Sequence, residues 1–410
     1  MILKCWNNIC LCGPEELFPV GAEPVENLFA PLVILVCRDG LKNRGVWAIH
    51  ALAELEEEES VRCLQPCETC GEESELERFV AQNGAMVANT AFVRLFDMLP
   101  RFLFPKTDVL RVTLVGLGDV GGTVLTGLKL LGREIDEIAV YDPNEAMCSR
   151  YEMELNQVLA EHPGGHVPRV TICPEERLFD CDLFLFTASR GVPAVGSNVK
   201  DVRMAQFDAN CAMLDVYAEK ARAAKFGGLF CQISDPVDHL AREVFLRSNR
   251  NEDGVYDFAG LLPEQVQGFG LGVMAARATY YARKEGVTFD DGRVYGPHGQ
   301  GLIVANHPAE SYDDAMSCHL TDLTRTANLK VRDLGFKPYI APGLSSAAVS
   351  ILRLVRGETH YGAVALGGAY FGCANRMTRY GVELQREAIC EQLLSRLEET
   401  HCALREFDYR

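Results

Sequence analysis

A glycine-rich turn, Gly116-Leu-Gly118-Asp-Val-Gly121, has the clearest chemical meaning in the sequence, because it joins a short β-type run to an amphipathic helical pattern. In such a turn the first glycine permits a sharp change of direction, and the second lets the backbone approach a pyrophosphate. The third lets the helix pack against the strand, and the helix N-terminus then faces the phosphates. The spacing of Gly116, Gly118 and Gly121 therefore predicts a dinucleotide-binding turn. A glycine turn with a purely structural role is the alternative.

An acidic residue closes the next predicted strand, roughly 20 to 30 residues beyond the turn, where dinucleotide-binding domains place a carboxylate for the ribose. This residue is Asp142. Its carboxylate can accept a hydrogen bond from a ribose hydroxyl, and it would repel a 2′-phosphate. Asp142 therefore favours NAD as the cofactor. In the alternative interpretation, Asp142 only caps the helix that follows.

A group of cysteines, Cys63, Cys67 and Cys70, with Cys10 and Cys12 upstream, forms a candidate metal site. A structural zinc site needs four ligands, usually supplied as two closely spaced pairs. Only Cys67 and Cys70 have the spacing of such a pair. We therefore expect thiols here and no bound metal.

The composition excludes several classes of protein. The 410 residues are enough for two or three structural units. A net charge of −17 would repel phosphate backbones and anionic lipids, so we expect neither a nucleic acid nor a membrane as partner. No apolar run approaches the roughly 20 residues of a spanning helix, and no signal peptide is recognisable. The 16 scattered cysteines are typical of reduced, buried thiols, which indicates the cytoplasm.

The chain divides by pattern into three regions, 1–105, 106–265 and 266–410. Residues 1–105 form an accessory region of unknown role, in which Ser74 to Phe104 has the periodicity of a helix with Gly84 as a candidate break. In residues 106–265 strands and helices alternate, which predicts an α/β fold with a doubly wound parallel sheet covered by helices on both faces. In residues 266–410 we expect a helix over 273–284, a hairpin-like section over 287–304, and a C-terminal helix from Glu383 to Leu404.

The order of short motifs from about Arg111 to Ala403 resembles the lactate/malate dehydrogenase family. No single motif is decisive, but six or more in the same order are hard to produce by chance. The first hundred residues match nothing in that family. The motifs, in order, are Gly116–Gly122, Tyr141-Asp142, Phe186–Ser189, Arg203 with Asn210, Ser234–Asp238, Gly268–Gly270 with Arg277, Gly296–Gly299 and Pro342–Ser345.

The resemblance implies a Rossmann domain followed by an α+β substrate domain, and transfer of a hydride between NAD and a 2-hydroxy or 2-oxo acid. It also implies a small carboxylic acid as substrate and a homo-oligomer. By motif, His298 takes the position of the acid/base, Arg277 that of the arginine that binds the substrate carboxylate, and Arg203 that of an arginine on a mobile loop.

These residue types suit the implied reaction. An imidazole titrates near neutral pH and can exchange a proton with a hydroxyl. A guanidinium makes two parallel hydrogen bonds to a carboxylate, and a second cation can stabilise the charge that develops on a carbonyl oxygen. Each residue also has a plainer interpretation: His298 as a turn residue, Arg277 as a salt-bridge partner, and Arg203 as a solvated cation.

The sequence departs from the family at two positions. The family pairs its histidine with an aspartate three residues before the carboxylate-binding arginine, and here that position is Met274. Where the family has asparagine before proline, this chain has Asp235 before Pro236. We hypothesise that Asp235 is catalytic and supports His298 from another side. Alternatively, Asp235 caps the helix that begins after Pro236.

The substrate and even the activity stay open at this point. The segment between Ser189 and Arg203 is longer than in lactate enzymes, and Arg190 and Lys200 are candidates for binding a second substrate carboxylate. The leading hypothesis is an NAD-dependent dehydrogenase that acts on a CH–OH group. The alternatives are a non-catalytic NAD-binding protein, which Met274 and the unmatched N-terminal region favour, and an NAD- and metal-dependent glycosidase of the same fold.

Overall fold

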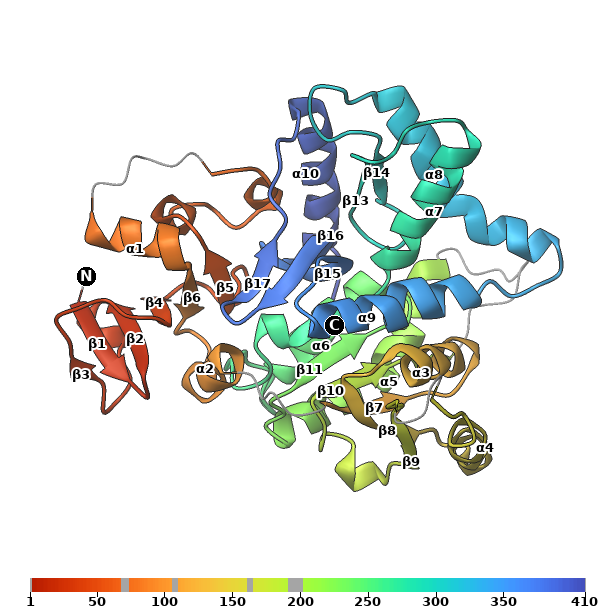
Figure 1. Ribbon diagram of the computed structural model, residues 1–410, viewed down its shortest axis with the longest axis horizontal. Helices are drawn as coiled ribbons and strands as arrows, with labels where there is room; N and C mark the ends of the chain where they lie inside the picture. The colour runs from red at the N-terminus through yellow and green to blue at the C-terminus, as the bar shows by residue number, and fades with distance from the viewer. Residues whose placement is uncertain (1, 68–73, 105–109, 161–164, 191–201, 410) are drawn as a thin grey trace.

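The computed structural model describes residues 2–67, 74–104, 110–160, 165–190 and 202–409, without the side chains of 202–205 (Figure 1). Its middle part contains six parallel strands in the spatial order 3-2-1-4-5-6, which is the order of a Rossmann domain. The prediction of an α/β, doubly wound parallel sheet is therefore confirmed. The strands are β7 (Leu110–Val115), β8 (Ile135–Tyr141), β9 (Arg169–Ile172), β10 (Leu183–Phe186), β11 (Leu229–Gln232) and β12 (Val266–Gly268).

Strand β10 shows how the sequence produces this layered arrangement. Its four side chains are all buried, with Leu183 and Leu185 in one core cluster and Phe184 and Phe186 in another. Because successive side chains of a strand point to opposite faces, a strand covered on both faces is apolar throughout. The helices of this part are α3 (Asp119–Leu131), α4 (Glu145–Leu155), α5 (Val202–Ala223) and α6 (Val237–Ser248), with the short 3-10 turn η4 (Glu175–Arg177).

The last third of the chain extends the sheet with antiparallel strands. Strand β12 pairs with β15, which pairs with β16, which in turn pairs with β17. A separate hairpin and several helices pack around this extension. The strands are β13 (Arg293–Tyr295), β14 (Ile303–Ala305), β15 (His360–Leu366), β16 (Ala369–Thr378) and β17 (Gly381–Leu384). The helices are η5 (Pro263–Gln265), α7 (Leu271–Lys284), α8 (Asp314–Asp333), the π-helical η6 (Pro342–Ala348), α9 (Val349–Val355) and α10 (Glu391–Arg405).

The expected C-terminal helix from Glu383 is wrong at its start, since Glu383 lies in strand β17 and helix α10 begins at Glu391. On β17, Val382 and Leu384 are buried and Glu383 between them is only half-buried, which is the alternation of a strand. The apolar residues of such a short segment fit either a helix or a strand. Hydrogen bonding to β16 stabilises the strand.

The N-terminal region forms its own set of strands, in the spatial order β3-β1-β2-β4-β6-β5. A parallel pairing of Trp47 with Val382 joins β5 to β17 and makes one continuous sheet (Figure 1). The elements are β1 (Ile2–Trp6), β2 (Ile9–Gly13), η1 (Glu15–Leu17), β3 (Glu23–Pro24), β4 (Leu32–Val36), β5 (Val46–Ile49), η2 (Leu52–Leu55), η3 (Val61–Leu64), α1 (Glu75–Asn83), β6 (Ala85–Asn89) and α2 (Leu95–Leu103).

The expected helix from Ser74 to Phe104 is also wrong, because strand β6 interrupts it. Gly84 adopts φ +68° and ends α1, which is a conformation that glycine takes without strain. The next five residues are all buried between β4 and β5, where a strand supplies hydrogen bonds on both sides. Pairing with these neighbours overrides the helical periodicity of the surrounding residues.

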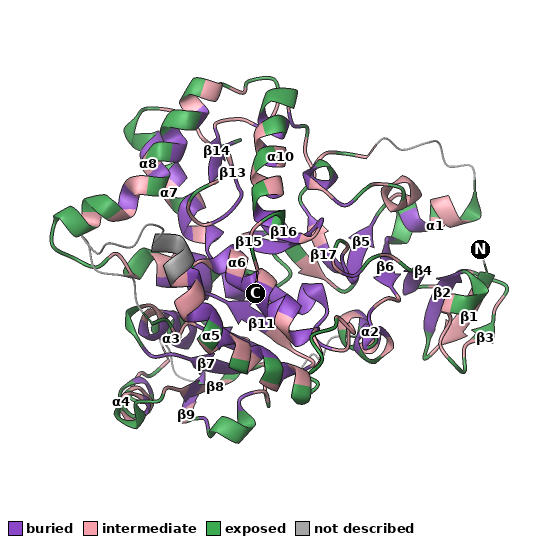
Figure 2. Ribbon diagram, turned by 180° about the vertical axis from the view of Figure 1, so that it is seen from behind, coloured by how far each residue is buried: buried purple, intermediate pink, exposed green. Residues whose placement is uncertain are grey.

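The N-terminal region shares a core with the rest of the chain. Phe92 packs edge-to-face on Phe245 of α6 with ring centroids 6.1 Å apart, and the Arg94 guanidinium donates to the carbonyl oxygens of Lys225 and Phe226. Figure 2 shows that β5, β6 and β11 are buried alike. None of the described helices combines the length and apolar composition that a membrane span requires.

Glu264 joins the two parts through a buried carboxyl group. It is 1% exposed, and its Oε1 accepts a hydrogen bond of 2.9 Å from the Gly45 N–H. Its Oε2 has no hydrogen-bond partner within the described part of the chain. Burial is the main reason that the pKa of Glu264 is raised to about 7, and the nearby Arg44 opposes that rise.

This raised pKa predicts a specific loss of stability with rising pH. Between the unfolded pKa near 4.5 and the folded pKa of about 7, only the unfolded chain releases the proton, so the free energy of unfolding falls as pH rises. The loss should approach about 3 kcal/mol at about pH 8. Glu264→Gln keeps the acceptor for Gly45 but cannot ionise, so it should be more stable than the natural chain at about pH 8 and similar at about pH 4. Urea unfolding between about pH 4 and about pH 8 measures this difference, and substitution of an exposed residue, Glu252→Gln, is the control. If the free energies of unfolding of Glu264→Gln and the natural chain changed in parallel with pH, the prediction would be contradicted.

Candidate functional site

The three glycines of the turn before α3 lie in different surroundings. A Cβ at Gly116, where φ is +95°, would lie 2.5 Å from the Ala188 nitrogen, and one at Gly121 would lie 1.9 Å from the Gly116 oxygen. A Cβ at Gly118 would meet no protein atom within 4 Å. Packing therefore requires the first and third glycines, whereas the second faces open space at the start of a helix. A ligand phosphate needs this arrangement.

Asp142 connects the end of β8 to the same turn. Its carboxylate accepts hydrogen bonds of 2.8 Å from the Leu117 N–H and 2.9 Å from the Asn144 N–H. Asn144, and not Asp142, is the N-cap of α4, so the alternative interpretation as a helix cap is wrong. An ionised carboxylate has about four acceptor positions, so Asp142 keeps the capacity to accept from a ribose hydroxyl.

A cavity of about 640 Å³ lies beyond the carboxyl end of β11, next to the first turn of α3. Three of the predicted catalytic residues, His298, Arg277 and Asp235, line this cavity together. Asp119 at the start of α3 lines it too. A crevice outside the carboxyl ends of parallel strands is where open α/β sheets bind ligands. The backbone of Arg203 lies in the first turn of α5, but its side chain is outside the described residues.

A backbone carbonyl holds the imidazole of His298. The Nδ1 atom lies 2.6 Å from the Gly270 oxygen, which also accepts a hydrogen bond of 2.6 Å from the Ser346 hydroxyl. A carbonyl oxygen can only accept, so Nδ1 carries the proton and Nε2 is left as the acceptor. The Gly270 carbonyl thus does the orienting that an aspartate at position 274 would do. Nothing in a sequence pattern indicates such a role for a backbone atom.

Asp238 is the functional candidate that the sequence interpretation missed. It is 3% exposed, and its Oδ2 accepts a hydrogen bond of 2.9 Å from the backbone N–H of His298. Burial raises the pKa of Asp238 to about 6, and His298 opposes the rise while Asp235 adds to it. The Ser234–Asp238 motif contains this residue, but the sequence does not show its hydrogen-bond partner, so a buried carboxylate cannot be distinguished there from a solvated one.

Asp235 is exposed, and its carboxylate makes no hydrogen bond to His298 among the residues that the structure describes. Its backbone oxygen accepts a hydrogen bond of 2.7 Å from Asn210. The N-cap of α6 is Pro236, and no side chain caps that helix. The capping interpretation of Asp235 is therefore wrong, whereas its hypothetical support of His298 stays a prediction.

Arg277 points its guanidinium at the cavity without a carboxylate partner within the described part of the chain. Its Nη1 lies 3.7 Å from the Met274 sulfur. Burial lowers the pKa of Arg277, and the neighbouring Tyr281 and Asp235 oppose this shift. Because arginine remains charged in proteins, the half-buried guanidinium can bind a ligand carboxylate.

Other cations surround the cavity. Arg325, Arg332 and Lys337 line it from α8 and the segment that follows. The Lys337 ammonium lies 2.9 Å from the carboxylate of Asp119, so an exposed ion pair connects this segment with the start of α3. Arg190 is exposed, and Lys200 lies outside the described residues.

The cysteine group is only partly described. Cys63 is buried with its thiol 3.6 Å from the Glu58 oxygen, whereas Cys70 lies outside the described residues. All the cysteines that are described are free thiols. Within the described ranges, the potential metal-binding atoms that gather within 4.8 Å of one another belong to Cys211, Asp215 and Glu243, between α5 and α6.

The close packing at Gly270 predicts a sharp difference between two glycine substitutions. In Gly270→Ala the new Cβ would lie 2.6 Å from the His298 Cβ and 2.8 Å from Nδ1, so the imidazole must move. We expect a loss of about 1–3 kcal/mol in the free energy of unfolding, together with a change in the ¹⁵N NMR shift of His298 Nδ1. Gly118→Ala, with no protein atom in reach, should change stability by less than about 0.5 kcal/mol. If Gly270→Ala changed neither the free energy of unfolding nor the ¹⁵N shift of His298 Nδ1, the contact between Gly270 and His298 would be contradicted.

Comparison with known proteins supports the fold. No protein-family model and no characterised protein sequence matches the chain. Among solved structures, a lactate dehydrogenase from a Medee basin deep-sea metagenome library has a TM-score of 0.58 at 18% identity, covering 73% of this chain and 98% of that chain. The malate dehydrogenase from Picrophilus torridus, in its apo form, has a TM-score of 0.57 at 17% identity (72% and 95% covered). The malate dehydrogenase from Archaeoglobus fulgidus, in complex with NADH, has a TM-score of 0.58 at 18% identity (72% and 97% covered). The chain therefore has the fold of lactate and malate dehydrogenases.

Proposed function

We propose that this chain is an NAD-dependent oxidoreductase that transfers a hydride between NAD and a 2-hydroxy or 2-oxo acid. The supporting observation is that His298 and Arg277 line one cavity with the first turn of α3, directly after the glycine turn. Solved structures with this fold include lactate and malate dehydrogenases, one of them with NADH. A cavity of about 640 Å³ also suits a small acid beside a nicotinamide.

The residues of the glycine turn fit a dinucleotide. The open space that a Cβ at Gly118 would point into leaves room for a pyrophosphate at the N-terminus of α3. Asp142, at the end of the adjacent strand, would accept a hydrogen bond from the ribose. NAD, when bound, would accept or supply the hydride. Asp119 and Lys337 both line the cavity and form an ion pair. This pairing reduces the repulsion between the Asp119 carboxylate and a phosphate.

His298 and Arg277 have distinct tasks in this proposal. With Nδ1 held by the Gly270 carbonyl, His298 Nε2 would take the proton from the substrate hydroxyl and return it in the reverse direction. The Arg277 guanidinium would hold the substrate carboxylate through two parallel hydrogen bonds. Arg203 would stabilise charge on the substrate oxygen. Asp235, which lines the same cavity, would support His298 with a second carboxylate besides that of Asp238.

The proposal is tested by mixing the purified chain with NADH and a panel of 2-oxo acids. We expect a fluorescence change on binding NADH and a loss of NADH absorbance with at least one acid. His298→Gln should lower kcat by about 10²- to 10⁴-fold with an unchanged Kd for NADH. Gly118→Ala should weaken NADH binding at least about tenfold, since its methyl group enters the space meant for the pyrophosphate. Equal turnover in His298→Gln, or equal NADH binding in Gly118→Ala, would contradict these assignments.

Asp238 provides a test that depends on pH. With a pKa of about 6, its carboxylate is ionised at about pH 8 and can stabilise a protonated imidazole next to it. Asp238→Asn keeps the acceptor for the His298 N–H but removes the charge. We expect kcat at about pH 8 to fall by about 10- to 100-fold, whereas near pH 5 the two proteins should differ little. A loss of the same size at both pH values, or a parallel loss of NADH binding, would indicate a structural role instead.

A second candidate is a non-catalytic NAD-binding protein on the same fold. Met274 favours it, because the position that would carry a carboxylate for the histidine is apolar and contacts Arg277 instead. NADH binding without turnover of any acid in the panel would select this candidate, and absence of NADH binding would remove both.

We also propose a cellular compartment and a set of partners for the protein. The free thiols of the described residues favour a reducing compartment such as the cytoplasm. We further propose a homo-oligomer, which the resemblance to lactate and malate dehydrogenases implies. The net charge of −17 supports the absence of a nucleic acid or membrane partner.

A further inference from the structure

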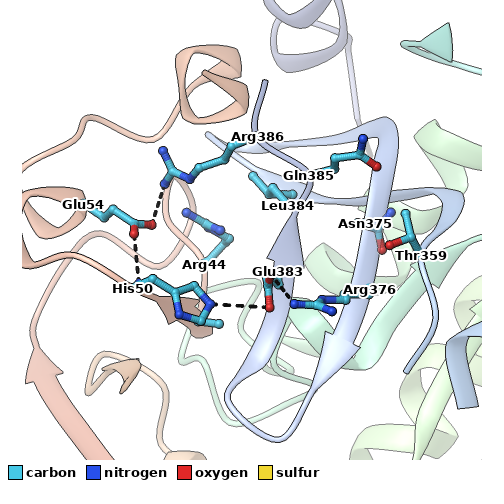
Figure 3. A pocket seen from close by; sticks show the side chains of 11 residues that line it. Arg44, His50, Glu54, Thr359, Asn375, Arg376, Glu383, Leu384, Gln385 and Arg386 are labelled. Atoms are coloured by element: carbon cyan, nitrogen blue, oxygen red, sulfur yellow. Dashed lines mark hydrogen bonds and ion pairs between the residues drawn. The ribbon is translucent and has the colours of Figure 1, made fainter. Parts of the chain in front are cut away.

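A second cavity, of about 400 Å³, lies between the N-terminal region and the last third of the chain (Figure 3). We call it the seam cavity, and its polar walls include Arg44, His50, Glu54, Asn375, Arg376 and Glu383. It lies where β5 and β17 run parallel but are joined at a single pair, Trp47 with Val382. His50 follows directly after β5, and Gln385 follows directly after β17. The cavity therefore opens beside the carboxyl ends of two adjacent parallel strands.

The carboxylates of the seam cavity are already bound by other protein groups. Glu54 Oε1 accepts from the backbone N–H groups of His50 and Ala51, and its Oε2 lies 2.9 Å from Arg386 (Figure 3). Glu383 Oε1 lies 2.7 Å from Arg376, and its Oε2 lies 3.7 Å from His50 Nε2. Each of these two carboxylates is thus already paired with an arginine, so neither presents an unpaired negative charge to a ligand.

The cations of the same wall keep free donors. The Arg44 guanidinium is 4% exposed as a residue and uses Nε for Glu59 Oε1 at 2.8 Å. Arg376 uses Nη2 for Glu383. Among the described residues, no hydrogen bond involves the two Nη atoms of Arg44 or the Nε and Nη1 atoms of Arg376. A cavity whose carboxylates are paired with arginines and whose guanidinium donors are open suits a ligand that supplies acceptors.

We propose that the seam cavity binds a small oxyanion, a carboxylate or phosphate group, through Arg44 and Arg376. Guanidinium groups present paired N–H donors that match the oxygens of these anions. Partial burial strengthens such an interaction relative to open solvent, and β5 and β17 would both contact the ligand. The cavity shares no lining residue with the proposed oxidoreductase site, so binding here does not depend on that function.

Calorimetric titration of the full chain tests the proposal with two probes, inorganic phosphate and citrate, at an ionic strength held constant with sodium chloride. We expect saturable binding of at least one probe. The probe whose binding depends more strongly on Arg376 identifies the anion class, since Arg277 in the other cavity also offers a guanidinium to a carboxylate. Arg376→Ala should weaken binding at least about tenfold. Glu383→Gln should strengthen it severalfold because a neighbouring negative charge is removed, whereas a cation site would be weakened by the same substitution.

Matched variants separate binding from folding. Arg150→Ala removes an ion-paired arginine of similar exposure on α4, away from the cavity, and it should bind the probe as the natural chain does. Each variant is first compared with the natural chain in thermal unfolding without ligand, and Arg376→Gln replaces Arg376→Ala if that variant does not fold. The proposal is overturned if neither probe saturates below about 20 mM, if the folded Arg376 variant binds normally, or if Glu383→Gln weakens binding.

Discussion

The hydrogen bond from His298 Nδ1 to the Gly270 carbonyl is the interaction on which the site depends. It fixes the imidazole so that Nε2 is the nitrogen with a free lone pair. Its length of 2.6 Å is possible only because position 270 lacks a Cβ, which would lie 2.6 Å from the His298 Cβ. Gly270 follows strand β12 and precedes helix α7, so the sixth parallel strand and the helix that carries Arg277 both set the position of the imidazole. Asp238 on α6 holds the backbone of His298 from the other side. The orientation of the imidazole ring is thus set by a backbone carbonyl, whereas Asp238 holds only the backbone of His298.

The same sheet connects this site with the N-terminal region. The Gly372 carbonyl on β16 accepts a hydrogen bond of 2.8 Å from Gly296, at the start of the turn that carries His298. Strand β16 pairs with β17, and β17 pairs with β5 of the N-terminal region. Residues 1–105 therefore extend the sheet and the core of the chain. The aromatic packing of Phe92 on Phe245 and the buried Glu264 reinforce this joint.

Much of the fold follows from local sequence patterns, because strands that are buried on both faces are apolar throughout and alternate with helices. The apolar run of β10 and the glycine turn are examples, and the ordered motifs placed His298, Arg277 and Asp235 in one cavity. The predicted elements are wrong where pairing with strands distant in the sequence determines the secondary structure. The run over residues 85–89 continues a helical periodicity and becomes a strand only between β4 and β5, and the strand β17 depends on β16 in the same way. A backbone carbonyl such as that of Gly270 has no signature in the sequence at all.

In the proposed reaction, a substrate acid and a nicotinamide meet at the imidazole of His298. The most direct test is a crystal structure of the chain with NADH and oxamate, an unreactive analogue of a 2-oxo acid. We expect the oxamate carboxylate on Arg277, its carbonyl oxygen within hydrogen-bond distance of His298 Nε2, and the nicotinamide against the same carbon. An oxamate bound elsewhere, or a nicotinamide that lies outside this cavity, would contradict the account.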